Sequence, residues 1–216
     1  MRRVIYSSSS SAYGDTVTLP KIEAAEPLPR SPYAAAKLAG EQYVLAFARA
    51  GTVEGVALRY FNVFGPRQDP NSPYAAVIPA FLSAAYEGRP VTMFGDGRQT
   101  RDFTYVANVV EANVLAARAP AAAASGTVAN VGAGQRTSLL ALIDLIREVT
   151  GRSLLCTSRP PRPGDVRDSL AGLERAERVL GYRPAVALRD GLKRTWAWFV
   201  EAQRAELATA PVVAGA

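Results

Sequence analysis

Short apolar runs alternate along this chain with longer segments of helical pattern, and this alternation constrains the fold more than any other feature. The apolar runs at 3–6, 56–60, 91–94, 128–131 and 154–157 have the length of buried strands. Helical patterns cover 32–50, 75–87, 106–117, 139–149, 173–180 and 188–203, while the alanine-rich 119–125 reads as a helix end and loop. Pro32 suits a first helical turn, and Gly51 and Gly151 follow helix ends. Strands that alternate with helices predict an α/β fold.

The first helical segment contains a tyrosine and a lysine four residues apart, Tyr33 and Lys37. Residues at this spacing lie one turn apart on the same helix face. A neighbouring positive charge stabilises the phenolate form of a tyrosine, which could then act as a base. The spacing is common by chance, but Lys37 is one of only three lysines in the chain. The pair is therefore a candidate for catalysis.

A run of five serines, Ser7 to Ser11, follows the first apolar run and is closed by Ala12-Tyr13-Gly14. We expect the strand to end at Tyr6 and the segment from Ser7 to Pro32 to be a loop. In open α/β sheets, ligands bind just outside the carboxyl ends of strands, where a serine can donate a hydrogen bond to a substrate oxygen. The alternative is a flexible linker, which an apolar strand does not normally precede.

Two further motifs make the pattern specific: Leu58-Arg59-Tyr60-Phe61-Asn62-Val63-Phe64-Gly65-Pro66-Arg67-Gln68-Asp69-Pro70, and Phe94-Gly95-Asp96-Gly97 followed by Arg101-Asp102-Phe103-Thr104-Tyr105-Val106. From Arg3 to about Gln203, the chain resembles the C-terminal two-thirds of extended short-chain dehydrogenases/reductases of the NAD-dependent epimerase/dehydratase family. The resemblance is greatest to UDP-hexose 4-epimerases, particularly those that accept N-acetylated sugars. It implies the C-terminal part of a Rossmann-like, doubly wound parallel sheet with a smaller α/β substrate-binding domain. Residues 1–66 and about 100–131 would belong to the NAD-binding domain, 67–99 and 132–203 to the nucleotide-sugar domain, and 204–216 to a disordered tail.

Composition excludes several other classes. The chain has no histidine and one cysteine, Cys156, so an internal disulfide is impossible and we expect no metal site. No run approaches the roughly 18 apolar residues of a membrane span, and a cytoplasmic enzyme fits. The net charge of +6 could indicate nucleic acid, but the arginines are scattered and an anionic diphosphate would account for part of the excess.

One part of a dinucleotide-binding domain is not found in the sequence. Such a domain opens with a strand, a glycine-rich turn and a helix whose N-terminus binds the pyrophosphate. Nothing before Val4 supplies this turn, and Gly132-Ala133-Gly134 lies too late in the chain. We therefore expect a truncated chain that is inactive alone, with Met1 not the start of the functional enzyme.

The resemblance assigns the catalytic roles to Ser9, Tyr33 and Lys37. Tyr33 would take the proton from the sugar 4-hydroxyl while hydride passes to NAD, Lys37 would stabilise the phenolate and hold the nicotinamide ribose, and Ser9 would bind O4. The resulting 4-keto sugar would turn over and be reduced on its other face. The cofactor contacts would be Ser7, Tyr33, Lys37, Tyr60, Asn62 and Val63.

The resemblance also implies a UDP-sugar site. Asn62, Arg101 and Arg162 would contact the diphosphate, and Asp165 a ribose hydroxyl. Ala76, Val77 and Phe94 would line the nucleotide pocket, while Gln68, Ser10 and Ser11 would face the sugar. Ser169, a small residue at the wall of the hexose pocket, would leave space for a 2-N-acetyl group, although it could simply begin the helix near Leu173. Tyr13, Tyr43, Trp196 and Trp198 are expected to pack.

The alternatives differ in the chemistry that they require. Similar 4,6-dehydratases have an Asp-Glu pair where this chain has Ser10 and Ser11, and UDP-glucuronate decarboxylases have a glutamate at Ser11, so the serines favour an epimerase. A non-catalytic UDP-sugar-binding remnant is the alternative from another class. Apolar residues surround the 32–50 helix widely, among them Leu38, Val44, Leu45 and Phe47, which predicts a homodimer for the complete protein.

Overall fold

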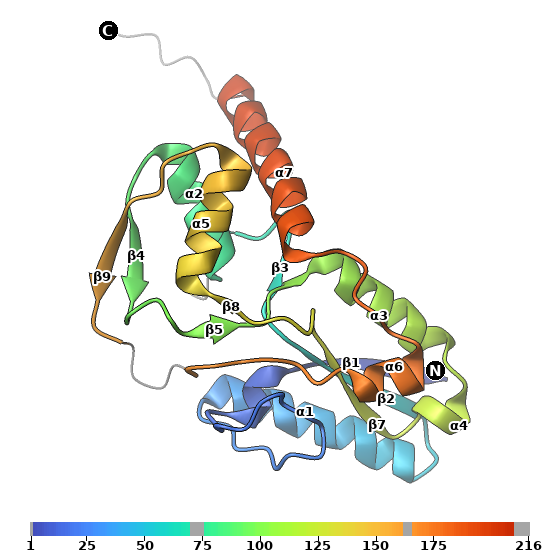
Figure 1. The fold of residues 1–216 in the computed structure, drawn as a ribbon. Helices are drawn as coiled ribbons and strands as arrows, with labels where there is room; N and C mark the ends of the chain where they lie inside the picture. Colours follow the sequence, from blue (N-terminus) through green and yellow to red (C-terminus); the bar gives the residue numbers. More distant parts are fainter. Residues whose placement is uncertain (1, 70–75, 162–165, 210–216) are drawn as a thin grey trace, which may run out of the picture.

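The computed structural model describes residues 2–69, 76–161 and 166–209 and confirms the α/β fold (Figure 1). Its main sheet has three parallel strands in the order β1-β2-β7, formed by Arg3–Ser9, Glu54–Tyr60 and Thr127–Val131. Ser9 pairs with Tyr60, and Tyr60 with Val131, so the carboxyl ends of the three strands lie at the same edge. This edge is where an open parallel sheet binds ligands.

Helices cover both faces of this sheet. α1 (Pro32–Arg49) packs against β1 and β2 on one face, and α3 (Val106–Arg118) lies on the other. The alternation along β2 shows this directly, because Arg59 bonds to Glu41 of α1 while the next residue, Tyr60, bonds to Asn113 of α3. α4 (Ala121–Ala124) and α6 (Glu174–Leu180) complete this core, with Val56, Leu58, Ala112, Ala129, Val131, Ala176 and Tyr182 among its buried residues.

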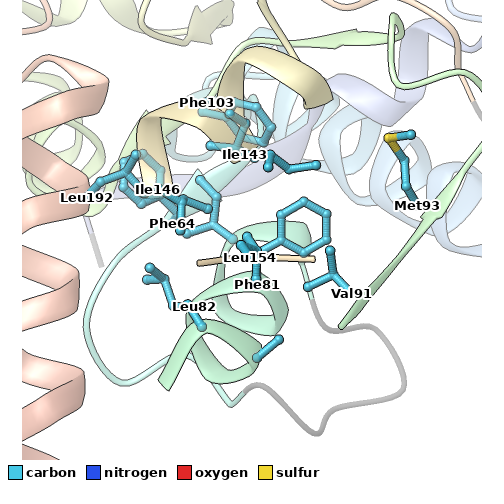
Figure 2. Close-up of a cluster of buried hydrophobic side chains, with 14 of the residues drawn as sticks. Phe64, Phe81, Leu82, Val91, Met93, Phe103, Ile143, Ile146, Leu154 and Leu192 are labelled. Carbon is cyan, nitrogen blue, oxygen red and sulfur yellow. The ribbon is translucent and has the colours of Figure 1, made fainter. Parts of the chain in front are cut away.

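A second core is formed by α2 (Val77–Glu87), α5 (Leu139–Thr150) and α7 (Leu188–Thr209) beside the parallel pair β4 (Val91–Phe94) and β9 (Cys156–Arg159). Figure 2 shows its side chains converging, with Phe64, Phe81, Ile146 and Leu154 near the centre and Leu192 contributed by α7. Full burial of side chains of this size contributes about 1.5–3 kcal/mol each.

Two short strand pairs connect the cores. β3 (Val63–Phe64) pairs with β6 (Thr104–Tyr105), and β5 (Thr100–Arg101) with β8 (Thr137–Ser138). Between β5 and β6, the buried Asp102 carboxylate accepts hydrogen bonds from the backbone N–H groups of Ala133, Gly134 and Ala171. Burial raises the pKa of Asp102, and these three bonds act against the increase. Asp102 thus fastens the segment that carries Ser169 to the end of β7.

Several sequence-based boundaries need correction. β1 continues through Ser9, so three serines that we expected in a loop belong to a strand, and Ser10–Tyr13 forms a 3-10 helix. Residues 121–124, within the stretch expected as a helix end and loop, form the separate short helix α4, and the strand expected at 154–157 lies at Cys156–Arg159. α7 continues to Thr209, so residues 204–209 of the expected disordered tail are helical, while 210–216 lie outside the described residues.

The aromatic residues that we expected to pack differ in how far they are buried. Tyr13 is buried and Trp196 packs against the second core, as expected, but Tyr43 is 70% exposed on α1. The division into two domains stays a prediction, and α6 packs in the first core although it lies in the stretch assigned to the second domain. Within the parts of the chain that the structure describes, no helix is long and apolar enough to cross a membrane.

Candidate active site

The serine run is held in a fixed geometry at the end of β1. Ser9 is the N-cap of the 3-10 helix, and its hydroxyl oxygen accepts hydrogen bonds from the Ser11 N–H, at 3.2 Å, and the Ser11 hydroxyl, at 2.9 Å. An N-cap side chain forms this kind of bond because the first N–H groups of a helix have no partner within the helix. The serines are therefore part of an ordered turn, and the flexible-linker alternative is wrong.

Tyr33 and Lys37 lie side by side on α1, as their spacing predicts. The helix begins with Pro32 after the N-cap Ser31, whose hydroxyl accepts from the N–H of Ala34 at 3.1 Å. The Lys37 ammonium lies 5.8 Å from the centre of the Tyr33 ring and donates to the backbone oxygen of Ser7 at 2.9 Å. A positive charge is thus held beside the phenol at the end of β1.

A cavity of about 450 Å³ brings most of the predicted catalytic residues together. Ser9 and Tyr33 both line it, and the other predicted residues on its wall are Ser10, Ser11, Tyr60, Asn62, Val63, Arg101 and Ser169. A base and a hydroxyl donor at one cavity can remove a proton from a bound hydroxyl group and hold its oxygen.

Ser169 lines this cavity and has a buried hydroxyl without a hydrogen-bond partner among the described residues. The residue is 8% exposed. Its backbone N–H donates to Thr100 O at 3.1 Å, and the neighbouring Asp168 carboxylate accepts from the Thr100 hydroxyl at 2.5 Å. This bond lowers the pKa of Asp168, as does the nearby Arg136. A buried hydroxyl without a partner is costly, which suits a group that binds a ligand.

Two further cavities adjoin the first through Arg101, which lines all three. One, of about 250 Å³, is lined by the predicted residues Asn62, Val63, Ala76, Val77, Phe94 and Arg101. The other, of about 540 Å³, is lined by Phe94, Arg101, Asp96, Arg159 and Arg167 among others. Together they extend from the serines towards a region rich in arginine.

Some predicted residues lie elsewhere. Ser7 does not line these cavities, and its hydroxyl shares a hydrogen bond of 3.2 Å with the Tyr60 hydroxyl. Lys37 stands behind Tyr33, bonded to Ser7. Gln68 donates its side-chain N–H to Val63 O at 3.1 Å and so supports the loop that follows β2. Arg162 and Asp165 lie outside the described residues.

Sequence reasoning missed Lys21 and Arg30, both of which line the 450 Å³ cavity. Lys21 is 3% exposed, its ammonium donates to Thr16, and burial lowers its pKa. Its backbone N–H donates to Leu170 O at 2.8 Å, which joins it to the Ser169 segment. The scarcity of lysine in the sequence could have marked Lys21 as a candidate. Its bond to Leu170 could not be predicted, because the two residues lie far apart in sequence.

Comparison with known proteins identifies similar chains. A family model described as "NAD dependent epimerase/dehydratase family" matches residues 1–132. The UDP-glucose 4-epimerase of Mycolicibacterium smegmatis is 39% identical over 200 residues, which cover 92% of this chain and 63% of that protein.

Solved structures agree. The UDP-N-acetylglucosamine 4-epimerase of Methanobrevibacter ruminantium, in complex with UDP-N-acetylmuramic acid, has a TM-score of 0.87 and 39% identity, covering 94% of this chain and 64% of that one. The UDP-glucose 4-epimerase of Thermotoga maritima, with UDP-glucose, has a TM-score of 0.88 and 39% identity, covering 94% and 65%. The chain thus spans about three fifths of the length of the curated relatives that it matches.

Proposed function

The chain belongs to the NAD-dependent epimerase/dehydratase family, and on this basis we propose that it forms the catalytic and substrate-binding part of a UDP-hexose 4-epimerase. The proposal depends on one observation: Ser9 and Tyr33 line the same cavity, and the Lys37 ammonium lies 5.8 Å from the centre of the Tyr33 ring. The adjoining cavities lined by Arg101 give space and positive charge for the nucleoside diphosphate.

The residues present fit the nicotinamide and ribose of NAD. An ammonium has three N–H donors, and the structure gives that of Lys37 one bond, to Ser7 O, so donors remain for ribose hydroxyls. Tyr60, which shares a hydrogen bond with Ser7, lines the cavity together with Asn62 and Val63. When bound, NAD supplies a reversible acceptor for hydride from C4 of the sugar. The 216 residues contain no glycine-rich pyrophosphate turn, so we propose that this chain alone is inactive.

The proton chemistry follows from the two groups at the cavity. Tyr33, as phenolate, accepts the proton of the sugar 4-hydroxyl while Ser9 donates a hydrogen bond to the same oxygen. Lys37 stabilises the phenolate electrostatically from the adjacent turn. The same tyrosine returns the proton when C4 is reduced from the other face, so the configuration at C4 is inverted without net oxidation of the sugar.

The cavity lining favours epimerisation over the related eliminations. Among the described residues on its wall there is no carboxylate, and Ser10 and Ser11 stand where a dehydratase or decarboxylase would need an acid. A serine hydroxyl does not ionise near neutral pH and is a poor general acid, so it would not assist loss of the 6-hydroxyl.

We assign the nucleotide to the two outer cavities. Ala76, Val77 and Phe94 would contact the base, and Asn62 and Arg101 the diphosphate. Arg162 and Asp165 keep their proposed contacts to phosphate and ribose by resemblance alone, as does Gln68 to the sugar.

We propose that the substrates include UDP-GlcNAc and UDP-GalNAc as well as UDP-Glc and UDP-Gal. The support is Ser169, whose small side chain leaves space at the cavity wall and whose buried hydroxyl needs a partner that an acetamido group can supply.

The decisive experiment measures interconversion of both UDP-sugar pairs by the full-length protein, by chromatography of the nucleotide sugars. Tyr33→Phe should reduce kcat by about 10²-fold or more, and near-normal turnover would remove Tyr33 from the mechanism. Ser169→Tyr should reduce kcat/KM for UDP-GlcNAc while largely sparing UDP-Glc. Full activity of that variant on UDP-GlcNAc would show that Ser169 does not limit the pocket.

A second candidate is a non-catalytic UDP-sugar-binding protein. It is compatible with the three cavities that Arg101 joins, because a UDP-sugar could bind in them without any transfer of hydride. Tight binding of UDP-sugars by the full-length protein, without any turnover, would favour this function over the first.

We also propose that the complete protein is a homodimer that pairs through α1. Tyr43 is 70% and Phe47 53% exposed on this helix, which is more apolar surface than a solvated helix needs.

A further inference from the structure

The helix that carries Tyr33 and Lys37 has a third ionisable residue in line with them, Glu41. The three are spaced by four residues, so Glu41 lies one turn beyond Lys37 on the same side of α1. It is 0% exposed, although a glutamate is almost never fully buried unless it is paired. The proposed mechanism gives it no role.

The Glu41 carboxylate joins α1 to the ends of both site strands. One oxygen accepts from the Ser8 hydroxyl at 2.7 Å and from Arg59 Nε at 2.9 Å, and the other accepts from Arg59 Nη2 at 2.6 Å. Ser8 directly precedes Ser9 in β1, and Arg59 directly precedes Tyr60 in β2. Each partner of Glu41 is therefore the chain neighbour of a residue on the cavity wall.

Arg59 is enclosed as fully as its partner. It is 2% exposed, and its guanidinium lies 4.6 Å from the centre of the Tyr13 ring. The Tyr13 hydroxyl in turn donates to the Asn130 side chain in β7 at 2.7 Å. The ion pair thus ties α1 to all three strands and to the serine turn.

Stability alone does not explain such a pair. Removing two charges from water costs about as much as their attraction returns, and apolar replacements are often neutral or stabilising. What an apolar contact cannot supply is direction, and a bidentate pair with a third hydrogen bond fixes the helix against sliding or rotation. The Lys37 ammonium depends on this placement, because it must reach Ser7 O from α1 while it stays beside Tyr33.

We propose that Glu41 and Arg59 are positioning residues that set the place of the Tyr33–Lys37 turn relative to Ser9. This inference rests on the proposed function, because it concerns the same site. It adds that the accuracy of proton transfer at Tyr33 is determined by a buried ion pair one turn beyond Lys37 and two turns from Tyr33, which touches neither substrate nor cofactor.

The test uses the full-length protein and the double variant Glu41→Leu/Arg59→Met, which replaces the pair by apolar side chains of similar size. The matched control is Glu54→Gln, which weakens the Arg3–Glu54 ion pair between the same two strands at their other ends. The expected result is a Tm close to wild type and little change in KM. We expect kcat to fall on the order of 10²-fold, as for a misplacement of about 1 Å. The control should keep kcat.

Hydrogen exchange of the amides at 33–40 gives a readout that needs no activity, and exchange there should become faster in the double variant only. If the wild type shows no epimerase activity, the proposed function itself fails, and faster exchange then shows only that the ion pair holds α1 in place. A kcat within about twofold of wild type, or an equal loss in Glu54→Gln, would overturn the inference. If the double variant does not fold, the Ser8→Ala variant tests the inference instead. This variant keeps the ion pair and should lower kcat about fivefold, the equivalent of one hydrogen bond. Unchanged kcat and unchanged exchange in Ser8→Ala would overturn the inference.

Discussion

α1 approaches β1 closely at Gly40, and whether Gly40→Ala stabilises or destabilises the protein should depend on the neighbouring Tyr6 side chain. A Cβ atom at Gly40 would lie 2.2 Å from the hydroxyl oxygen of Tyr6 and 2.5 Å from its Cζ. Ordinary contacts are at least about 1 Å longer, so Gly40→Ala must displace the Tyr6 ring or the helix. The ring is not free to move without loss, because the Lys37 ammonium lies 5.7 Å from its centre.

The magnitude follows from two opposing terms. Alanine is favoured over glycine in a helix interior by about 1 kcal/mol, and overpacking costs about 1 to 3 kcal/mol. Gly40→Ala should therefore lie between neutral and about 2 kcal/mol less stable than wild type. In a Tyr6→Ala background the obstacle is gone, and the same substitution should stabilise by about 1 kcal/mol.

Urea and thermal unfolding, followed by circular dichroism on the four proteins of this cycle, measure the coupling. For a chain of this size, each 1 kcal/mol corresponds to about 2 to 4 °C in Tm. The expected coupling is about 1 to 3 kcal/mol. If Gly40→Ala raises Tm equally in both backgrounds, the contact with Tyr6 does not constrain the helix and the reasoning fails.

Three further outcomes are expected. Hydrogen bonding from Thr100 lowers the pKa of Asp168 below its ordinary 3.8. The stability that Asp168 contributes is therefore present above about pH 4 and is lost as the pH falls through the lowered value. Asp168→Asn should flatten the dependence of Tm on pH in that acid range, and an unchanged dependence would contradict this. Calorimetry should find little affinity of the 216-residue chain for NAD, because the pyrophosphate turn supplies much of the binding; micromolar binding would be inconsistent with that view. Tyr43→Glu/Phe47→Glu should convert the full-length protein from dimer to monomer in light scattering, and a wild type that is already monomeric at micromolar concentration would refute the dimer.

The sequence predicted those parts of the site that depend on local spacing. Tyr33 and Lys37 are adjacent because a helix of this length with Pro32 at its start fixes the relation of residues four apart. The α/β alternation and most helix ends could be read in the same way, since glycine in the left-handed conformation ends α5 at Gly151.

The remaining features depend on contacts between distant residues. Serine is not among the residues enriched in strands, and Ser7 to Ser9 extend β1 because residues 58–60 of β2 pair with them. Lys21 reaches the site through a backbone bond to Leu170, and Glu41 is buried because Arg59 meets it from another element. A glutamate on a helix normally predicts a solvated face, so only the tertiary fold could reveal its partner.

The capping of the 3-10 helix by Ser9 has a consequence for the polarity of the site. A hydroxyl has one proton to donate and two lone pairs to accept. Both bonds that Ser9 receives come from Ser11, its N–H and its hydroxyl, and together they occupy both lone pairs. What Ser9 can still offer to the cavity is its proton, which makes it a donor of fixed sign. Such a group binds a deprotonated or carbonyl oxygen better than an alcohol, so the turn favours acceptor oxygens in the cavity whatever the ligand is.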